Sequence, residues 1–353
     1  MALSGVFKIF DQNNDVVKNI KSTISSGVWS GGSGTLSTYF TQSAQSSSTG
    51  EYYYDVYKTN PATDTEAEVQ VSVTYGHIQG SGSKGLVGST TGNRASAAIH
   101  AQFVNLLLGP NVNQFTYEGD VTSKHFYAIS LRRARMREKM DPGNWELWLS
   151  GSAAPVGSAA AGQNPGFTKL VDDSGATANP EVGIGGRVFN VVSGSIQGGA
   201  VSEYLAASDQ PGGGIGLFYP DLGLILLNAD ILDATGSITT VTGSDTNGNN
   251  SQKIFDQIVG GGKFQARREE RLSSTHFFCR AGNKEFNFSN NPTFFTTGSG
   301  EFTNPTFFKD PKTYLTTIGL YNNANELLAV AKLSQPILKS YSREALLKVK
   351  LDF

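Results

Sequence analysis

Residues Ile318–Leu333 read IGLYNNANELLAVAKL, and this stretch shows the strand–turn–strand pattern that we expect in much of the chain. Two apolar runs typical of strands flank an asparagine-rich run, and asparagine side chains favour turns by bonding to nearby backbone. Further on, the chain stops on LKVKLDF, which alternates apolar and polar residues up to Phe353. The sequence therefore predicts an antiparallel hairpin followed by one more strand.

The sequence also suggests which strand pairs with this last strand. An unpaired regular edge invites aggregation, so the strand must either belong to the fold of its own chain or complete the sheet of a neighbour. We expect the first, with LLAVAKL at Leu327–Leu333 as the antiparallel partner and SQPILKS as the turn between them. In either case Val349, Leu351 and Phe353 form the apolar face that has to be covered.

Composition extends the β-rich pattern to the whole chain. Glycine accounts for 41 of 353 residues, and charged residues make up 16%, against about 25% in typical domains. Many turns between aromatic and β-branched residues indicate a mainly β fold, or a β-rich α+β fold. We expect antiparallel, sandwich-like sheets with long Gly/Ser-rich loops. One principal helix is predicted at 93–108, with Ile99, Phe103 and Leu106 packed on a sheet.

Domain boundaries are read from changes in composition. Residues 151–166 are rich in Ala, Gly, Ser and Pro and predict a linker or long loop between a domain at 1–150 and another at 167–353. The ends of the chain share a strand–turn–strand pattern, so the two termini could also pair in one sheet. Within 1–150, DPGN at Asp141–Asn144 predicts a turn between two strands.

Motifs for chemistry are absent from the sequence. The four histidines are far apart, and none has zinc-site spacing with the single cysteine, Cys279. A G-x-G-x-x-G pattern begins at Gly80, but the predicted helix starts too late to meet a phosphate. The polar run at Asp245 has Lys253 where a calcium ligand belongs. We expect no catalytic, cofactor-binding or metal residues, and no enzyme.

Charge gives the candidate contact residues. A formal charge of −2 gives no bulk attraction for nucleic acid or an anionic membrane, so we expect neither as a partner. The one dense basic run is RRARMREK at 132–139. Read as a strand, it places Arg133, Arg135 and Arg137 on one face, and we predict that this ladder meets an acidic partner. The N-terminus lacks a secretory signal pattern, which predicts folding in a reducing cytoplasm.

Several phrases of this chain resemble virion structural proteins of tailed phages, in particular T4-like myoviruses of marine and cyanobacterial hosts. They are scattered over 125–353, and the chain's ending is also similar to that of T4-type baseplate wedge subunits. These phrases are EFNFSNNPTFF at 285–295, DPKTYLTTIGLYNNANELLAVAKLSQPILKS at 310–340, LKVKLDF at 347–353, MREKMDPGNWELWL at 136–149 and GLFYPDLGLILLNADIL at 216–232.

This resemblance implies a baseplate wedge or neighbouring contractile-tail component, present in several copies in the virion and assembled in the host cytoplasm without cofactors. Its partners would be other tail and baseplate proteins, and more copies of itself. Low charge and loop-rich composition suit large assembly interfaces, which are depleted in Lys and Glu. The alternatives are a tail-fibre or receptor-binding protein and a glycan-degrading tail protein.

Overall fold

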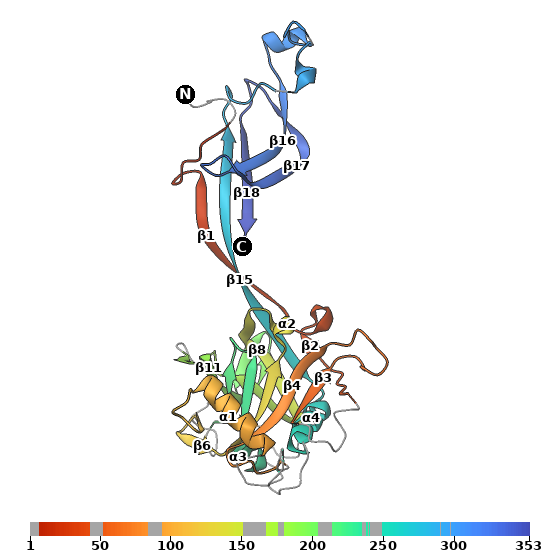
Figure 1. Ribbon diagram of the computed structural model, residues 1–353, viewed down its shortest axis with the longest axis vertical. Helices are drawn as coiled ribbons and strands as arrows, with labels where there is room; N and C mark the ends of the chain where they lie inside the picture. The colour runs from red at the N-terminus through yellow and green to blue at the C-terminus, as the bar shows by residue number, and fades with distance from the viewer. Residues whose placement is uncertain are drawn as a thin grey trace. The chain divides into compact units, whose positions relative to one another are not determined.

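The computed structural model describes residues 7–42, 52–83, 94–150, 167–175, 180–203, 214–234, 238, 240, 249–289, 291–296 and 298–353. It is mainly β, as predicted, with antiparallel pairing and few helices (Figure 1). The strands are β1 Val16–Gly27, β2 Thr35–Leu36, β3 Tyr53–Tyr57, β4 Val69–His77, β5 Phe115–Tyr117, β6 Val121–Ser123, β7 His125–Leu131, β8 Lys139–Ser150, β9 Phe167–Asp172, β10 Glu181–Gly183, β11 Gly186–Gln197, β12 Ala200–Glu203, β13 Gly216–Tyr219, β14 Leu224–Asn228, β15 Phe264–Ala281, β16 Thr313–Tyr321, β17 Leu327–Lys339 and β18 Ala345–Asp352. The α-helices are α1 Ala95–Leu107, α2 Arg133–Met136, α3 Ala229–Ala234 and α4 Asn249–Gly261.

The chain forms two compact units. Unit 1 comprises Met1–Thr23 and Arg271–Phe353, and unit 2 comprises Ile24–Glu270. These boundaries differ from the predicted domains 1–150 and 167–353, because they fall inside the continuous strands β1 and β15 rather than at a change in composition. The predicted linker at 151–166 lies outside the described residues. Both ends of the chain belong to unit 1, where β1 and β18 each pair with β15.

The strands of unit 2 form a ring. Their order runs β15-β8-β9-β11-β13-β14-β7-β4-β3. The segment at 35–40 then joins the two ends, because Leu36 pairs with Phe264 of β15 and Phe40 pairs with Tyr57 of β3. Closing a sheet on itself removes the open edges on which other chains could add strands. The segment at 35–40 therefore covers part of the edges of β15 and β3.

Both apolar cores of the described residues lie in unit 2. The larger core is lined by inward residues of the ring, among them Tyr127, Trp145 and Phe218, and it also contains Ile254 and Ile258 of α4. Helix α4 contacts β3, β4 and β8. The second core lies between α1, the β5–β6 hairpin and the outer side of β7, β13 and β14, with Phe126 at its centre.

Helix α1 is close to its predicted range, and its predicted packing face is confirmed in part, because Phe103 packs against the second core. Leu106 is 54% exposed and Ile99 and Phe103 are only half-buried, whereas His100, Val104 and Leu107 are buried. Gly76 of β4 leaves room for close packing at this place. A side chain at Gly76 would lie 2.7 Å from the Phe126 ring and 3.2 Å from the His100 Cα.

The predicted turn at Asp141–Asn144 is a bulge within one strand. β8 continues from Lys139 to Ser150, and its register against β15 shifts between Met140 and Trp145. Gly143 takes a positive φ of 77°, which favours glycine. Its N–H donates to the buried Asp172 carboxylate at 2.9 Å, so a partner from β9 holds the extra residues and the chain does not reverse.

Unit 1 contains the predicted hairpin. β16 and β17 pair antiparallel, and the connecting turn is held by the Asn322 side chain, which accepts from the N–H of Ala324 and of Glu326, both at 2.9 Å. β18 is a strand as expected, but its predicted partner was wrong. It pairs with β15, because Ser334–Leu338 extend β17 rather than forming a turn.

Unit 1 buries few apolar side chains of its own. Among its described residues they are Val16, Ala281, Phe294, Leu320, Ala345 and Val349. The similar NPTFF phrases form two 3-10 turns, Pro292–Phe294 and Pro305–Phe308, and the rings of Phe294 and Phe307 stack at 4.9 Å. Lys339 is fully buried, and its ammonium donates to Asn287 Oδ1 at 2.9 Å and to two backbone oxygens. Such a unit has little reserve of stability.

Candidate functional site

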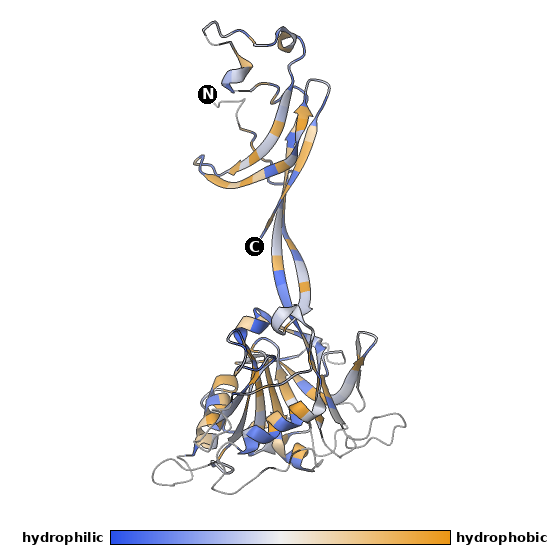
Figure 2. Cartoon of the chain, turned by 90° about the vertical axis from the view of Figure 1, so that its right-hand side faces the viewer, coloured by the Kyte–Doolittle hydropathy of each residue, from blue (hydrophilic) through white to orange (hydrophobic). Residues whose placement is uncertain are grey.

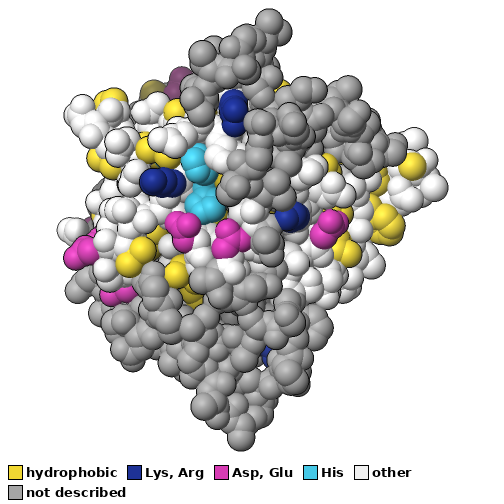
Figure 3. Space-filling view, turned by 90° about the horizontal axis from the view of Figure 1, so that it is seen from below, with side chains coloured by type: hydrophobic (Ala, Val, Ile, Leu, Met, Phe, Trp, Pro, Cys, Tyr) yellow, Lys and Arg dark blue, Asp and Glu magenta, His cyan; other side chains and the backbone are white. Residues whose placement is uncertain are grey.

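A chain of polar side chains crosses from β4 to α3 in unit 2. Tyr75 Oη lies 3.0 Å from His125 Nδ1, and His125 Nε2 lies 2.8 Å from Asp230 Oδ1. Because a carboxylate only accepts, His125 carries its proton on Nε2, and its Nδ1 accepts from the tyrosine. The His77 ring lies 5.6 Å from that of His125. Histidine and acidic side chains lie side by side on the face in Figure 3.

The protonation states of this network suit a structural link. Partial burial opposes ionisation of Asp230, but hydrogen bonds from Ser123 and His125 hold the pKa of that carboxyl below its usual value. Burial raises the pKa of Tyr75, so this phenol stays neutral. A tyrosine that stays protonated and donates a hydrogen bond to His125 is a poor nucleophile or base. The network ties α3 to β7 and β4.

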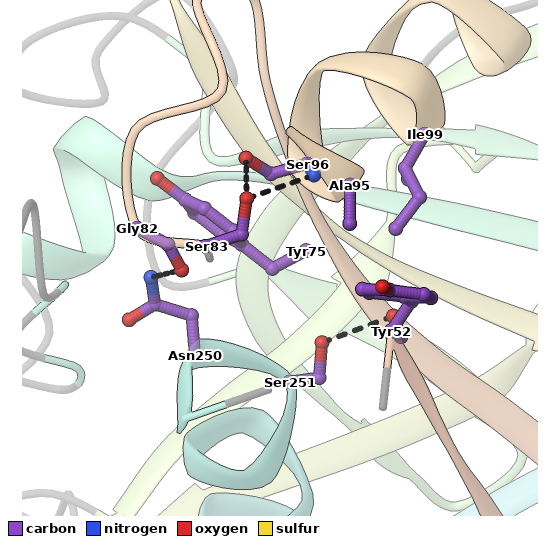
Figure 4. A pocket seen from close by; sticks show the side chains of 9 residues that line it. All are labelled: Tyr52, Tyr75, Gly82, Ser83, Ala95, Ser96, Ile99, Asn250 and Ser251. Carbon is purple, nitrogen blue, oxygen red and sulfur yellow. Dashed lines mark hydrogen bonds between the residues drawn. The ribbon is translucent and has the colours of Figure 1, made fainter. Parts of the chain in front are cut away.

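A small pocket lies beside this network (Figure 4). It lies between the end of β4, the start of α1 and the start of α4, and it holds about 10 Å³. That volume is near the lower limit for one water molecule. Ser83 Oγ accepts from the Ser96 N–H at 3.1 Å, and Asn250 donates to the Gly82 carbonyl at 3.3 Å. Polar groups of the wall are hydrogen-bonded to each other.

Two histidines near the pocket are held neutral. His77 Nδ1 accepts from the N–H of Gln79 at 3.0 Å and of Ser81 at 3.3 Å. Burial and the neighbouring His125 lower the pKa of His77 to about 4. Burial also lowers the pKa of His100, to about 4; its ring lies 5.5 Å from that of Phe126. In acid, both imidazoles would become charged in buried surroundings that disfavour the charge.

The free energy of unfolding should therefore fall as the pH is lowered from about 6.5 to about 4. In that window the unfolded chain binds protons at His77 and His100 and the folded chain does not, so each lowered pKa removes up to about 3 kcal/mol. Urea unfolding at pH 7.5, 6.0 and 4.5 measures this loss. His100→Leu should reduce the dependence by about half while keeping stability at pH 7.5. An unchanged dependence in that variant would assign the acid sensitivity to other groups.

The predicted basic ladder is not a strand. Residues 133–136 form the short helix α2, so Arg133, Arg135 and Arg137 do not share a strand face. Two of them pair within their own chain: Arg135 with Glu68 at 2.6 Å and Arg137 with Glu270 at 3.1 Å. Arg133 donates to a backbone carbonyl of the same turn at 3.0 Å. Met136 of the same short helix is buried, whereas the alternation predicted an extended chain here.

The C-terminal candidates occupy different environments. Val349 is buried and Leu351 is half-buried on the inner side of β18, whereas Phe353 is 74% exposed. The alternation therefore predicted the face of Val349 and Leu351 correctly. The Phe353 backbone still pairs with Ser273, at 2.9 Å and 3.2 Å. Of these three side chains, Phe353 alone is freely available for a partner.

Sequence reasoning missed a candidate contact surface on the hairpin of unit 1. Val330 pairs with Gly319 and Lys332 pairs with Thr317, so the side chains of Val330 and Lys332 share one face. Tyr321 pairs with Leu327 after a register shift, and the side chains of both lie over Gly319 on that face. We call Tyr321, Leu327, Val330 and Lys332 the hairpin patch. Leu327 is 53% exposed and Val330 57%, and Figure 2 shows hydrophobic residues along both strands.

A signal for this patch was present in the sequence. LLAVAKL is apolar on both faces, a pattern typical of strands that are covered on both sides. One face of β17 lies towards its own unit, where Ala329, Ala331 and Leu333 are half-buried, and the hairpin patch is uncovered. Unit 1 also holds more than half of the exposed large apolar side chains of the described residues, in less than a third of the chain.

Comparison with known proteins finds no matching family model, no matching curated protein and no matching solved structure. Across the described residues, His, Cys, Asp and Glu side chains nowhere gather in threes as metal ligands would. None of the helices in the described part of the chain has the length and apolar character of a membrane span.

Proposed function

We propose that this chain is a non-enzymatic structural subunit of a tailed-phage virion, a baseplate wedge or a neighbouring contractile-tail component that acts through protein–protein contacts. The observation that carries the proposal is the hairpin patch on a unit with few buried apolar side chains. Apolar strands left open in this way are typical of subunits that complete their core on assembly. The resemblance of residues 285–295 and 310–340 to myovirus proteins supports the place in a tail.

Two further features support a role without catalysis. The Tyr75–His125–Asp230 network uses its hydrogen bonds internally, and the neighbouring pocket has room for about one water. Neither offers a bound substrate a free nucleophile or base. In this proposal the subunit is present in several copies, is assembled in the host cytoplasm, and binds other tail and baseplate proteins rather than nucleic acid or membrane.

The proposal is tested in the phage that encodes the chain. Mass spectrometry of purified virions should find the protein in the tail fraction, and an amber mutation early in its gene should yield particles that lack a complete tail. Complementation with the wild-type chain should restore infectivity, and Val330→Asp should restore it poorly, because a carboxylate would enter the apolar contact. Absence of the chain from purified tails would overturn the proposal.

A further inference from the structure

The two units carry opposite formal charges. Unit 1 has 13 basic and 8 acidic residues, a charge of +5, while unit 2 has 15 basic and 22 acidic residues, a charge of −7. The near-neutral total of the chain hides this asymmetry. Opposite potentials on two surfaces attract them, and like potentials keep them apart. The chain is therefore electrostatically complementary to a second copy of itself.

The hairpin patch is the surface of unit 1 at which we locate this attraction. Its apolar side chains are exposed, although the Tyr321 ring also contacts that of Phe7 at 5.2 Å. Lys332 is exposed at its end without an ion pair among those found in the described residues. Arg343 and Lys348 of the same unit are also exposed. A symmetric contact of two unit 1 patches would bring two charges of +5 together. Unit 2 of another copy carries a net charge of the opposite sign.

We propose that the hairpin patch of one copy docks on unit 2 of a second copy, so that the chains associate head to tail. Such a contact uses a different surface on each partner, so it can be repeated into a ring or a stack or made twice in a reciprocal pair. This inference deepens the assembly role proposed above and rests on it. It assigns the partner of the patch as another copy of the chain.

Sedimentation velocity of the full chain tests this arrangement. Association should depend on protein concentration and weaken by about tenfold between 50 and 500 mM NaCl, because part of the attraction is between charges. A double variant, Val330→Asp with Lys332→Glu, should remain monomeric. The matched variant, Val330→Ile with Lys332→Arg, keeps shape and charge and should associate like the wild type. A wild type that is monomeric at 50 mM salt and about 100 µM overturns the proposal.

A mixing experiment separates head-to-tail from symmetric contact. The labelled double variant has a damaged patch but an intact unit 2, so it should sediment with excess unlabelled wild type and cap its assemblies. This result requires only unit 2 of the variant to be folded, which circular dichroism and thermal unfolding can check. A label that stays monomeric beside associating wild type would overturn the head-to-tail contact. Chains that are monomeric in solution yet present in tails would refute self-association without refuting the virion role.

Discussion

A chain that ends at Leu347 is expected to lose the fold of unit 1 while unit 2 stays folded. The deletion removes most of β18, which pairs with Ser274–Phe278 of β15, and with it the buried Val349. Burial of such a side chain stabilises by about 2 kcal/mol, and each lost backbone bond costs about 1 kcal/mol. The sum exceeds about 5 kcal/mol, which is the whole stability of a marginal domain.

Hydrogen exchange resolves the two units in this experiment. Amides of Phe277 and Cys279 should lose protection in the truncated chain, whereas those of β7 in unit 2 should keep it. Phe353→Ala serves as the control, because that side chain is 74% exposed and its backbone pairing with Ser273 remains. Normal protection of β15 in the truncated chain would mean that β18 contributes nothing to unit 1 and is held for a neighbour.

Local chemistry made the hairpin of unit 1 predictable from sequence. The turn depends on side-chain bonds from Asn322 to residues two and four positions later, and the strands depend on alternation. Both features depend on residues that are contiguous in the sequence. The partner of β18 could not be predicted in this way, because β15 lies more than 60 residues earlier in the chain. The nearer strand LLAVAKL is already paired with β16.

The errors at α1, Arg133–Arg137 and Asp141–Asn144 all involve contacts with residues distant in the sequence. Gly76 lies against α1, Glu68 and Glu270 pair with two of the arginines, and Asp172 accepts a hydrogen bond from Gly143. Propensity and spacing describe neighbours along the chain, and tertiary contacts override them.

The candidate contact surface was likewise predictable from the sequence only in part. The apolar character of β17 on both faces is visible in the sequence, but which face stays open depends on how unit 1 folds. The charge asymmetry is likewise invisible until the unit boundaries at 23/24 and 270/271 are known. The predicted domains 1–150 and 167–353 cut across both units and so mix their opposite charges.

Trp145→Ala is expected to be the most damaging single substitution in unit 2. The bulge at Gly143 sets the register of β8 so that Trp145 points inward, where it is fully buried and its ring lies 5.2 Å from that of Phe218. Removing the ring leaves a cavity in the larger core, and core truncations of this size cost about 3–5 kcal/mol. Urea unfolding at pH 7.5 should show this loss in the transition of unit 2.

Trp148→Ala provides a matched control on the same strand. Trp148 lies on the opposite face of β8, where it is half-buried beneath Lys169 and Lys263, whose ammonium groups lie 4.4 Å and 5.0 Å from its ring. Exposed contacts of this kind contribute about 0.5–1 kcal/mol each, so the loss should stay near 1–2 kcal/mol. Equal losses at the two positions would contradict the inward orientation of Trp145. The bulge would then not have the role assigned to it, because its effect is to set which of the two tryptophans enters the core.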